Sequence, residues 1–66
     1  MKLRIEIDMD GAAFEKCNGS EVARVLRNLA ACMRGVNLTR DSVSRIGASI
    51  PFDSNGNTCG KVEVIQ

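Results

Sequence analysis

The sequence contains no histidine, no tryptophan and no tyrosine, and it has only two phenylalanines. General acid–base catalysis, nucleophilic attack and metal activation each need a titratable group held beside a second group that tunes its pKa. Without histidine, a cysteine nucleophile would depend on a nearby lysine or arginine to lower its pKa. A chain of 66 residues also offers little depth for a desolvated pocket. We therefore expect a protein that is not an enzyme and that needs no cofactor.

Long hydrophobic runs and paired cysteines are also lacking. No apolar stretch approaches the roughly 18 residues that cross a bilayer, and MKLRIEID at residues 1–8 alternates in character where a signal peptide would be continuously apolar. The three cysteines, Cys17, Cys32 and Cys59, are widely spaced and odd in number, which is typical of reduced thiols rather than of a disulfide framework. We expect a cytoplasmic protein that does not bind membranes.

Positive charge is only slightly in excess, and the net charge of the chain is +1. No global field therefore points to nucleic acid or to an anionic membrane as the partner. Apolar residues make up 44% of the chain and charged residues 26%, which is the balance of a folded globular protein. The length predicts one small domain over residues 1–66.

What the sequence does contain is clear periodicity. Apolar residues alternate with charged ones over residues 2–9, which predicts a strand with one face in water: Leu3, Ile5, Ile7 and Met9 against Lys2, Arg4, Glu6 and Asp8. Residues 19–34 carry an apolar stripe of helical spacing, formed by Val22, Val25, Leu26, Leu29 and Met33.

Signals at both ends support this helix. Asn18 is the expected N-cap, and Glu21 falls at the third helical position, from which its carboxylate can reach back to the cap N–H. Arg34 suits the last turn, and Gly35 can adopt a left-handed closing conformation. The polar segment that follows, residues 36–44, is predicted to be a loop.

Two further strands are predicted after that loop. Four apolar residues alternate with other residues in the first of them: Ile46, Ala48, Ile50 and Phe52. We expect Phe52, like Phe14, to lie in the core, and Pro51 places the strand at an edge. Val62 and Val64 alternate with Lys61 and Glu63 in the third strand. The predicted fold class is α+β, in the order strand, helix, strand, strand, with one helix packed on one face of a three-stranded antiparallel sheet of order 1-3-2. The alternative is a sheet in which the first two strands are parallel neighbours and the helix is their crossover.

The stretch PFDSNGNTCG at residues 51–60 resembles both a calcium loop and a hairpin turn. A calcium loop that began at Asp53 would need glycine at its sixth position and glutamate at its twelfth, but those positions hold Thr58 and Val64. A three-residue loop of Ser54, Asn55 and Gly56, closed by Asp53 opposite Asn57, instead pairs Ala48 with Val62 and Ile46 with Val64. We therefore predict a turn and no metal site.

Two surfaces are candidates for binding. Arg24, Arg27 and Arg34 fall within roughly 80° of one another on the helix, and Arg40 and Arg45 follow in the chain. This basic stripe could bind phosphates or an acidic protein surface, although an ordinary solvated face with Glu21 paired to Arg24 is favoured. The open sheet face carries charges of both signs, which suits a protein partner or a homodimer.

Cys59 is the candidate for a reactive thiol, because a cation lies close to it in the sequence. It lies near Lys61, and we expect it to be a small residue on the solvent side of a strand. A reactive thiol at this position is the alternative. Cys32 is expected in the core or at its boundary.

Three segments together resemble a group of small proteins encoded by phages and prophages: DGAAFE at residues 10–15, EVARVLRNLA at residues 21–30 and DSNGNTCG at residues 53–60. The first is one residue shorter than the D-x-x-A-A-F-E pattern of that group, and EKCNG at residues 15–19 is more basic than its usual linker. The group has no established activity, so the resemblance assigns no functional residue.

The resemblance implies a bacterial host and action by contact with a host protein. The expected function is a phage or prophage accessory protein that binds a host protein stoichiometrically, for example to inhibit a host defence complex. The alternative is a nucleic-acid-binding regulator that uses the basic face of Arg24, Arg27 and Arg34.

Overall fold

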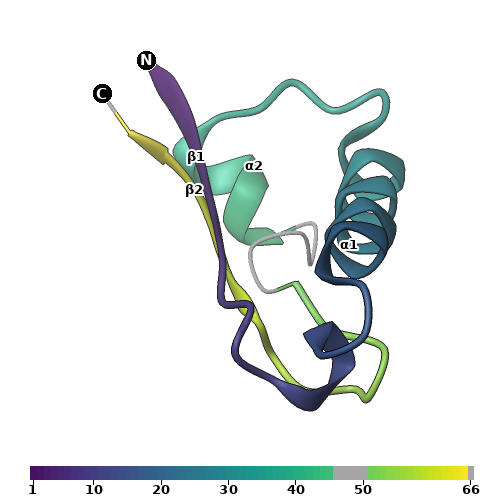
Figure 1. Cartoon of the computed structure of the whole chain (residues 1–66). Helices are drawn as coiled ribbons and strands as arrows, with labels where there is room; N and C mark the ends of the chain where they lie inside the picture. Colours follow the sequence, from purple (N-terminus) through teal and green to yellow (C-terminus); the bar gives the residue numbers. More distant parts are fainter. Residues whose placement is uncertain (46–50, 66) are drawn as a thin grey trace.

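The computed structural model describes residues 1–45 and 51–65 (Figure 1). Its elements follow in the order β1 (Lys2–Ile7), the 3-10 helix η1 (Ala12–Phe14), α1 (Asn18–Met33), α2 (Arg40–Arg45) and β2 (Gly60–Ile65). The two strands are antiparallel neighbours, with Leu3 opposite Val64 and Ile5 opposite Val62. This pairing brings the two ends of the chain together at one end of the sheet (Figure 1).

The α+β class agrees with the structure, but the predicted three-stranded sheet of order 1-3-2 is wrong, because the described residues form a two-stranded sheet. Most of the predicted second strand, residues 46–50, lies outside the described part of the chain. Its described end adds a single bridge between Phe52 and Thr58. The alternation that predicted this strand included Gly47, Ser49 and Pro51, and glycine and proline are depleted in strands.

The position of α1 agrees with the prediction to within one residue at each end. Gly35 closes the helix with φ of 78°, and the Val36 N–H donates to the Met33 carbonyl at 3.0 Å. The predicted capping box is wrong, because Cys17 occupies the N-cap position and no side chain bonds at this cap. The Glu21 carboxylate is used elsewhere.

The segment predicted as a loop contains the short helix α2. Thr39 begins it through a reciprocal pair of bonds: the Ser42 N–H donates to Thr39 Oγ1 at 3.1 Å, and the Thr39 N–H donates to Ser42 Oγ at 2.7 Å. Asp41 suits the positive end of the helix dipole in the first turn. The buried Val43 anchors α2, which packs against β2.

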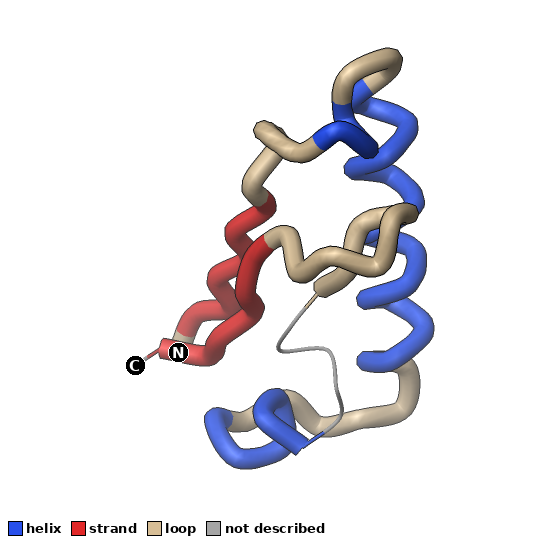
Figure 2. The backbone as a smooth tube through the Cα atoms, turned by 90° about the horizontal axis from the view of Figure 1, so that it is seen from below, coloured by secondary structure: helices blue, strands red, loops and turns tan. Residues whose placement is uncertain are grey.

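The core lies between α1, η1 and the beginning of β2. Its buried members are Phe14, Val25, Leu29, Cys59 and Val62. If one helix covered the sheet face, Leu3, Leu26, Ile50 and Val62 would share one interior. That expectation is wrong for Leu3 and Leu26, whose exposed fractions are 44% and 42%, and Ile50 lies outside the described residues. The sheet contacts α2 more closely than α1, and Figure 2 shows that the two helices lie apart from each other. One helix therefore does not cover the sheet face as predicted. The apolar side chains of β1 are therefore only partly covered, and Leu3 and Ile5 remain exposed.

Candidate binding site between helix α1 and the turn

The segment at residues 53–57 is a turn organised by one carboxylate. Asp53 Oδ1 accepts the Asn55 N–H at 3.0 Å and the Asn57 N–H at 2.9 Å. The Asp53 N–H donates to the Asn57 carbonyl at 2.9 Å, and Gly56 has φ of 82°. The predicted three-residue loop is confirmed. The carboxylate that begins the D-x-N-x-N pattern accepts hydrogen bonds from backbone N–H groups of the turn. The predicted pairs of Ala48 and Ile46 with β2 lie outside the described residues.

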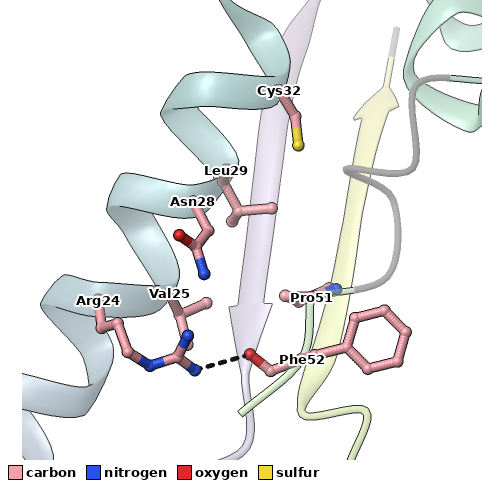
Figure 3. Close-up of a pocket in the computed structure, with 7 residues that line it drawn as sticks. All are labelled: Arg24, Val25, Asn28, Leu29, Cys32, Pro51 and Phe52. Atoms are coloured by element: carbon pink, nitrogen blue, oxygen red, sulfur yellow. Dashed lines mark hydrogen bonds between the residues drawn. The ribbon is translucent and has the colours of Figure 1, made fainter. Parts of the chain in front are cut away.

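A partly buried ion pair attaches this turn to α1. Arg24 donates from Nε to Glu21 Oε1 and from Nη2 to Glu21 Oε2, both at 3.0 Å. Glu21 Oε2 also accepts the Ser54 N–H at 2.7 Å, and Arg24 Nη2 donates to the Phe52 carbonyl at 3.0 Å (Figure 3). Helix α1 thus holds the backbone on either side of Asp53, where the turn begins, by charge-assisted bonds.

The electrostatics of this pair favour the charged forms of both side chains. Hydrogen bonding from Arg24 lowers the pKa of Glu21, and the Ser54 N–H lowers it further, against the opposing effect of burial. The bonds to Glu21 likewise raise the pKa of Arg24. The pair is therefore neutral as a unit, and the predicted Glu21–Arg24 pairing is confirmed.

Beside the ion pair lies a cavity of about 130 Å³. Its lining comes from α1 and from the segment before the turn, and consists of Arg24, Val25, Asn28, Leu29, Cys32, Pro51 and Phe52 (Figure 3). Small-molecule sites usually measure about 300–1,000 Å³, whereas an apolar cavity of about 150 Å³ holds a benzene molecule. This cavity therefore has room for one apolar side chain or one ring.

Phe52 gives this site an exposed aromatic surface. Phe52 is one of the residues that line the cavity, and it is 53% exposed. Figure 3 shows its ring turned away from α1, whereas its carbonyl oxygen faces Arg24. The sequence prediction placed this ring in the core, because an apolar residue at an alternating position of a strand was expected to face inward. That expectation is wrong.

The predicted basic residues have different environments. Arg24 is half-buried in the ion pair, while Arg27 on α1 is exposed. Arg34 is also exposed, but it lies just past the end of α1 with extended backbone. Arg40 is the exposed first residue of α2, and the side chain of Arg45 lies outside the described part of the structure. One of the three arginines of the helical stripe is thus already neutralised within the fold.

The cysteines differ from their predicted placement. Cys59 is buried in the core, where its thiol donates to the Pro51 carbonyl at 3.6 Å and burial raises its pKa. The prediction that it faces solvent is therefore wrong. Cys32 is exposed and lines the cavity. Sequence reasoning missed Cys17, whose exposed Sγ lies 3.2 Å from Ser20 Oγ, a hydrogen bond that lowers its pKa. Its position just before a helix was the available signal.

The polar face of the sheet carries the mixed charges that the sequence predicted. Arg4 lies 3.5 Å from Glu63 on the neighbouring strand and 3.6 Å from Glu6 on its own strand, while Lys61 lies 3.9 Å from Glu63. These side chains are all more than one third exposed. They form a solvated ladder of weak pairs.

Comparison with known proteins adds no family: no protein-family model, no curated protein and no solved structure matches this chain. No helix among the described residues is long and apolar enough to span a membrane. Within residues 1–45 and 51–65, cysteine and carboxylate side chains do not gather in threes as metal ligands would.

Proposed function

We propose that this chain is a non-enzymatic module that acts by stoichiometric binding to a second protein, through the surface formed by α1 and Phe52. The observation that carries the proposal is an exposed phenylalanine, Phe52, next to a largely apolar cavity of about 130 Å³ that it helps to line. Protein interfaces concentrate their binding energy in a few aromatic anchors and in the pockets that receive them. The ring can insert into a partner while the cavity receives one partner side chain.

The Glu21–Arg24 ion pair beside the cavity supports this proposed binding surface. Glu21 and Arg24 fix the carbonyl of Phe52 and the N–H of Ser54, so the backbone that carries the ring is held in place before a partner arrives. A preorganised anchor loses less conformational freedom on binding. Arg24 and Asn28 provide polar groups among the apolar walls of the cavity, which suits an interface with a polar rim.

The resemblance to small phage and prophage proteins gives the proposal its setting. In that setting the partner is a cytoplasmic protein of a bacterial host, and the binding event blocks a host complex such as a defence assembly. The chain would then work at one-to-one stoichiometry with its target.

A capture experiment with matched variants tests the proposal. A photo-crosslinking amino acid is placed at position 52, and separately at position 26, where Leu26 is exposed on α1 outside the cavity lining. In lysates from a panel of bacteria we expect one protein to be cross-linked from position 52 and not from position 26. The purified partner should bind the Leu26→Ala variant like the wild type and the Phe52→Ala variant at least tenfold more weakly. Equal binding of both variants, or no cross-linked protein, would contradict the proposal.

The nucleic-acid alternative predicted from Arg24, Arg27 and Arg34 remains a separate prediction with its own measurement. Titration of labelled DNA and RNA at low salt, with wild type and Arg27→Ala, reports phosphate contacts directly. Binding that weakens with rising salt and with Arg27→Ala would favour this alternative. The pairing of Arg24 with Glu21 is the reason that we prefer a protein partner.

A further inference from the structure

The outer edge of β1 is open among the described residues. β1 pairs with β2 along one edge, and α2 packs on the β2 side of the sheet (Figures 1 and 2). The apolar residues of the N-terminal segment are exposed to solvent. Their exposed fractions are 78% for Met1, 44% for Leu3, 39% for Ile5 and 45% for Met9. A two-stranded sheet is marginal by itself, and small domains often gain stability by association.

The hydrogen-bonding phase of β1 shows which backbone groups point outward. The Asp8 N–H donates to the Cys59 carbonyl at 2.6 Å, one step beyond the last ladder pair of Ile7 with Gly60. Residues of an antiparallel strand alternate between positions bonded to the neighbour and positions whose N–H and C=O point away from it. Since Asp8 is bonded to the β2 side, the groups of Leu3, Ile5 and Ile7 point to the open edge.

The order of charges along β1 makes two antiparallel copies of this strand complementary to each other. Lys2 and Arg4 precede Ile5, and Glu6 and Asp8 follow it at mirrored distances. If a second copy pairs antiparallel with Ile5 opposite its own Ile5, Arg4 of each copy faces Glu6 of the other, and Lys2 faces Asp8. Opposite charges directly across a ladder stabilise it, and like charges destabilise it.

The same register also places the apolar side chains of one copy opposite apolar side chains of the other. Leu3 of each copy then lies opposite Ile7 of the other, and Met1 lies opposite Met9. These pairs cover apolar side chains that are exposed in the single chain. The outward backbone groups of Leu3, Ile5 and Ile7 also meet one another, as a hydrogen-bonded ladder requires.

Neighbouring registers are disfavoured. Shifting the second strand by two residues keeps the outward backbone groups paired, but it places Arg4 opposite Arg4 in one direction and Glu6 opposite Glu6 in the other. Both shifts put like charges across the two-fold axis. Charge therefore selects the register centred on Ile5.

We propose that two copies of this chain associate through β1, antiparallel and in this register, to form a continuous four-stranded sheet in the order β2, β1, β1 and β2. The interface is isologous, because the same strand contributes both halves. This association goes beyond the proposed protein-binding function and uses a different surface from Phe52. The self-complementary order of charges on an open, half-apolar edge is what identifies the second copy as the occupant.

Charge reversal at the two positions next to Ile5 tests the register. Sedimentation velocity is measured over a range of concentrations for wild type, Arg4→Glu, Glu6→Arg and the double variant Arg4→Glu/Glu6→Arg. We expect the wild type to dimerise and each single variant to dimerise at least tenfold more weakly, because acidic or basic residues then face one another twice. The double variant should dimerise like the wild type, because its charges are exchanged but still opposite.

Mixing the two single variants provides a more specific test of the register. An equimolar mixture of Arg4→Glu and Glu6→Arg should form a heterodimer, because every charged pair across the two strands is then opposite in sign. Lys16→Glu, which reverses an exposed charge outside both strands, is the matched control and should leave dimerisation unchanged. A monomeric wild type, a mixture no more associated than its components, or single variants that dimerise like the wild type would each overturn the proposal. Circular dichroism identifies any unfolded single variant, and the double variant then decides the outcome.

Discussion

Gly60 is the position at which the fold leaves no room for a side chain. A Cβ atom there would overlap the Glu6 carbonyl group and lie 3.1 Å from Ile7 Cα, all backbone atoms of the paired strand. Backbone in a ladder cannot yield as the end of a flexible side chain can. Glycine at this position therefore allows β1 and β2 to approach where β2 begins.

We expect Gly60→Ala to lower the free energy of unfolding by about 1–3 kcal/mol or more, as overpacking against fixed atoms does. Urea denaturation followed by circular dichroism measures the change. Gly19→Ala is the matched control, because nothing lies within 4 Å of its Cβ position and alanine is favoured in a helix. Unchanged stability in Gly60→Ala would show that the strands are not paired at this position.

The cysteines provide a second prediction at the residue scale. The pKa of Cys17 is lowered by its hydrogen bond to Ser20, so a larger fraction of this exposed thiol is thiolate at neutral pH. Burial raises the pKa of Cys59 and shields it from reagents. We expect iodoacetamide at pH 7 to modify Cys17 at least tenfold faster than Cys59 in the folded protein, as followed by mass spectrometry. Ser20→Ala should slow the reaction of Cys17, and equal rates for the two thiols would contradict the structure.

At the scale of elements, α1 uses less of its apolar stripe than its periodicity suggests. Leu29 is 5% exposed in the core, whereas Leu26 is 42% exposed. We expect Leu29→Ala to cost about 2–5 kcal/mol, which is as large as the whole stability of many domains of this size. Leu26→Ala should change stability by about 0.5 kcal/mol or less. Chemical denaturation of both variants measures the contrast, and similar losses would mean that both side chains are buried.

The attachment of α1 to the turn should depend on pH. Because the pKa of Glu21 is lowered on folding, its contribution to stability is complete above the unfolded pKa of about 4.3 and is lost as pH falls through the lower folded value. We expect Glu21→Gln to be less stable than the wild type at pH 7, and the difference to shrink towards pH 3. Urea midpoints at both pH values measure it, with the exposed Glu15→Gln as control. A difference that stays constant with pH would exclude an ionised Glu21 in the folded state.

Elements with strong local signals were predicted well, and those with weak signals were not. The sixteen residues of α1 repeat their pattern over several turns, and Gly35 and the Asx turn at residues 53–57 carry specific backbone requirements. The short helix α2 was missed because six residues give too few repeats to show a period. Its reciprocal Thr39–Ser42 cap was the signal that could have revealed it.

At the scale of the whole molecule, the small core and the open edge of β1 have one consequence that can be measured without mutation. If folding and association are coupled through β1, the apparent stability must depend on protein concentration. We expect the midpoint of thermal unfolding to rise when the concentration of the wild type is raised about 100-fold. The midpoint of Arg4→Glu should change much less over the same range. An invariant wild-type midpoint would mean that the chain unfolds as a monomer.

The local features of this protein follow from its amino-acid sequence alone: the alternation of β1, the span of α1, the turn around Asp53 and the mirrored charges beside Ile5. Each depends on residues that are neighbours along the chain. Which surfaces are covered depends instead on the packing of distant segments: Cys59 is buried, Phe52 is half-exposed, and Glu21 bonds to Ser54 rather than to its own helix cap. Burial depends on which distant segments meet, and a chain this short cannot cover every apolar face that its periodicity creates.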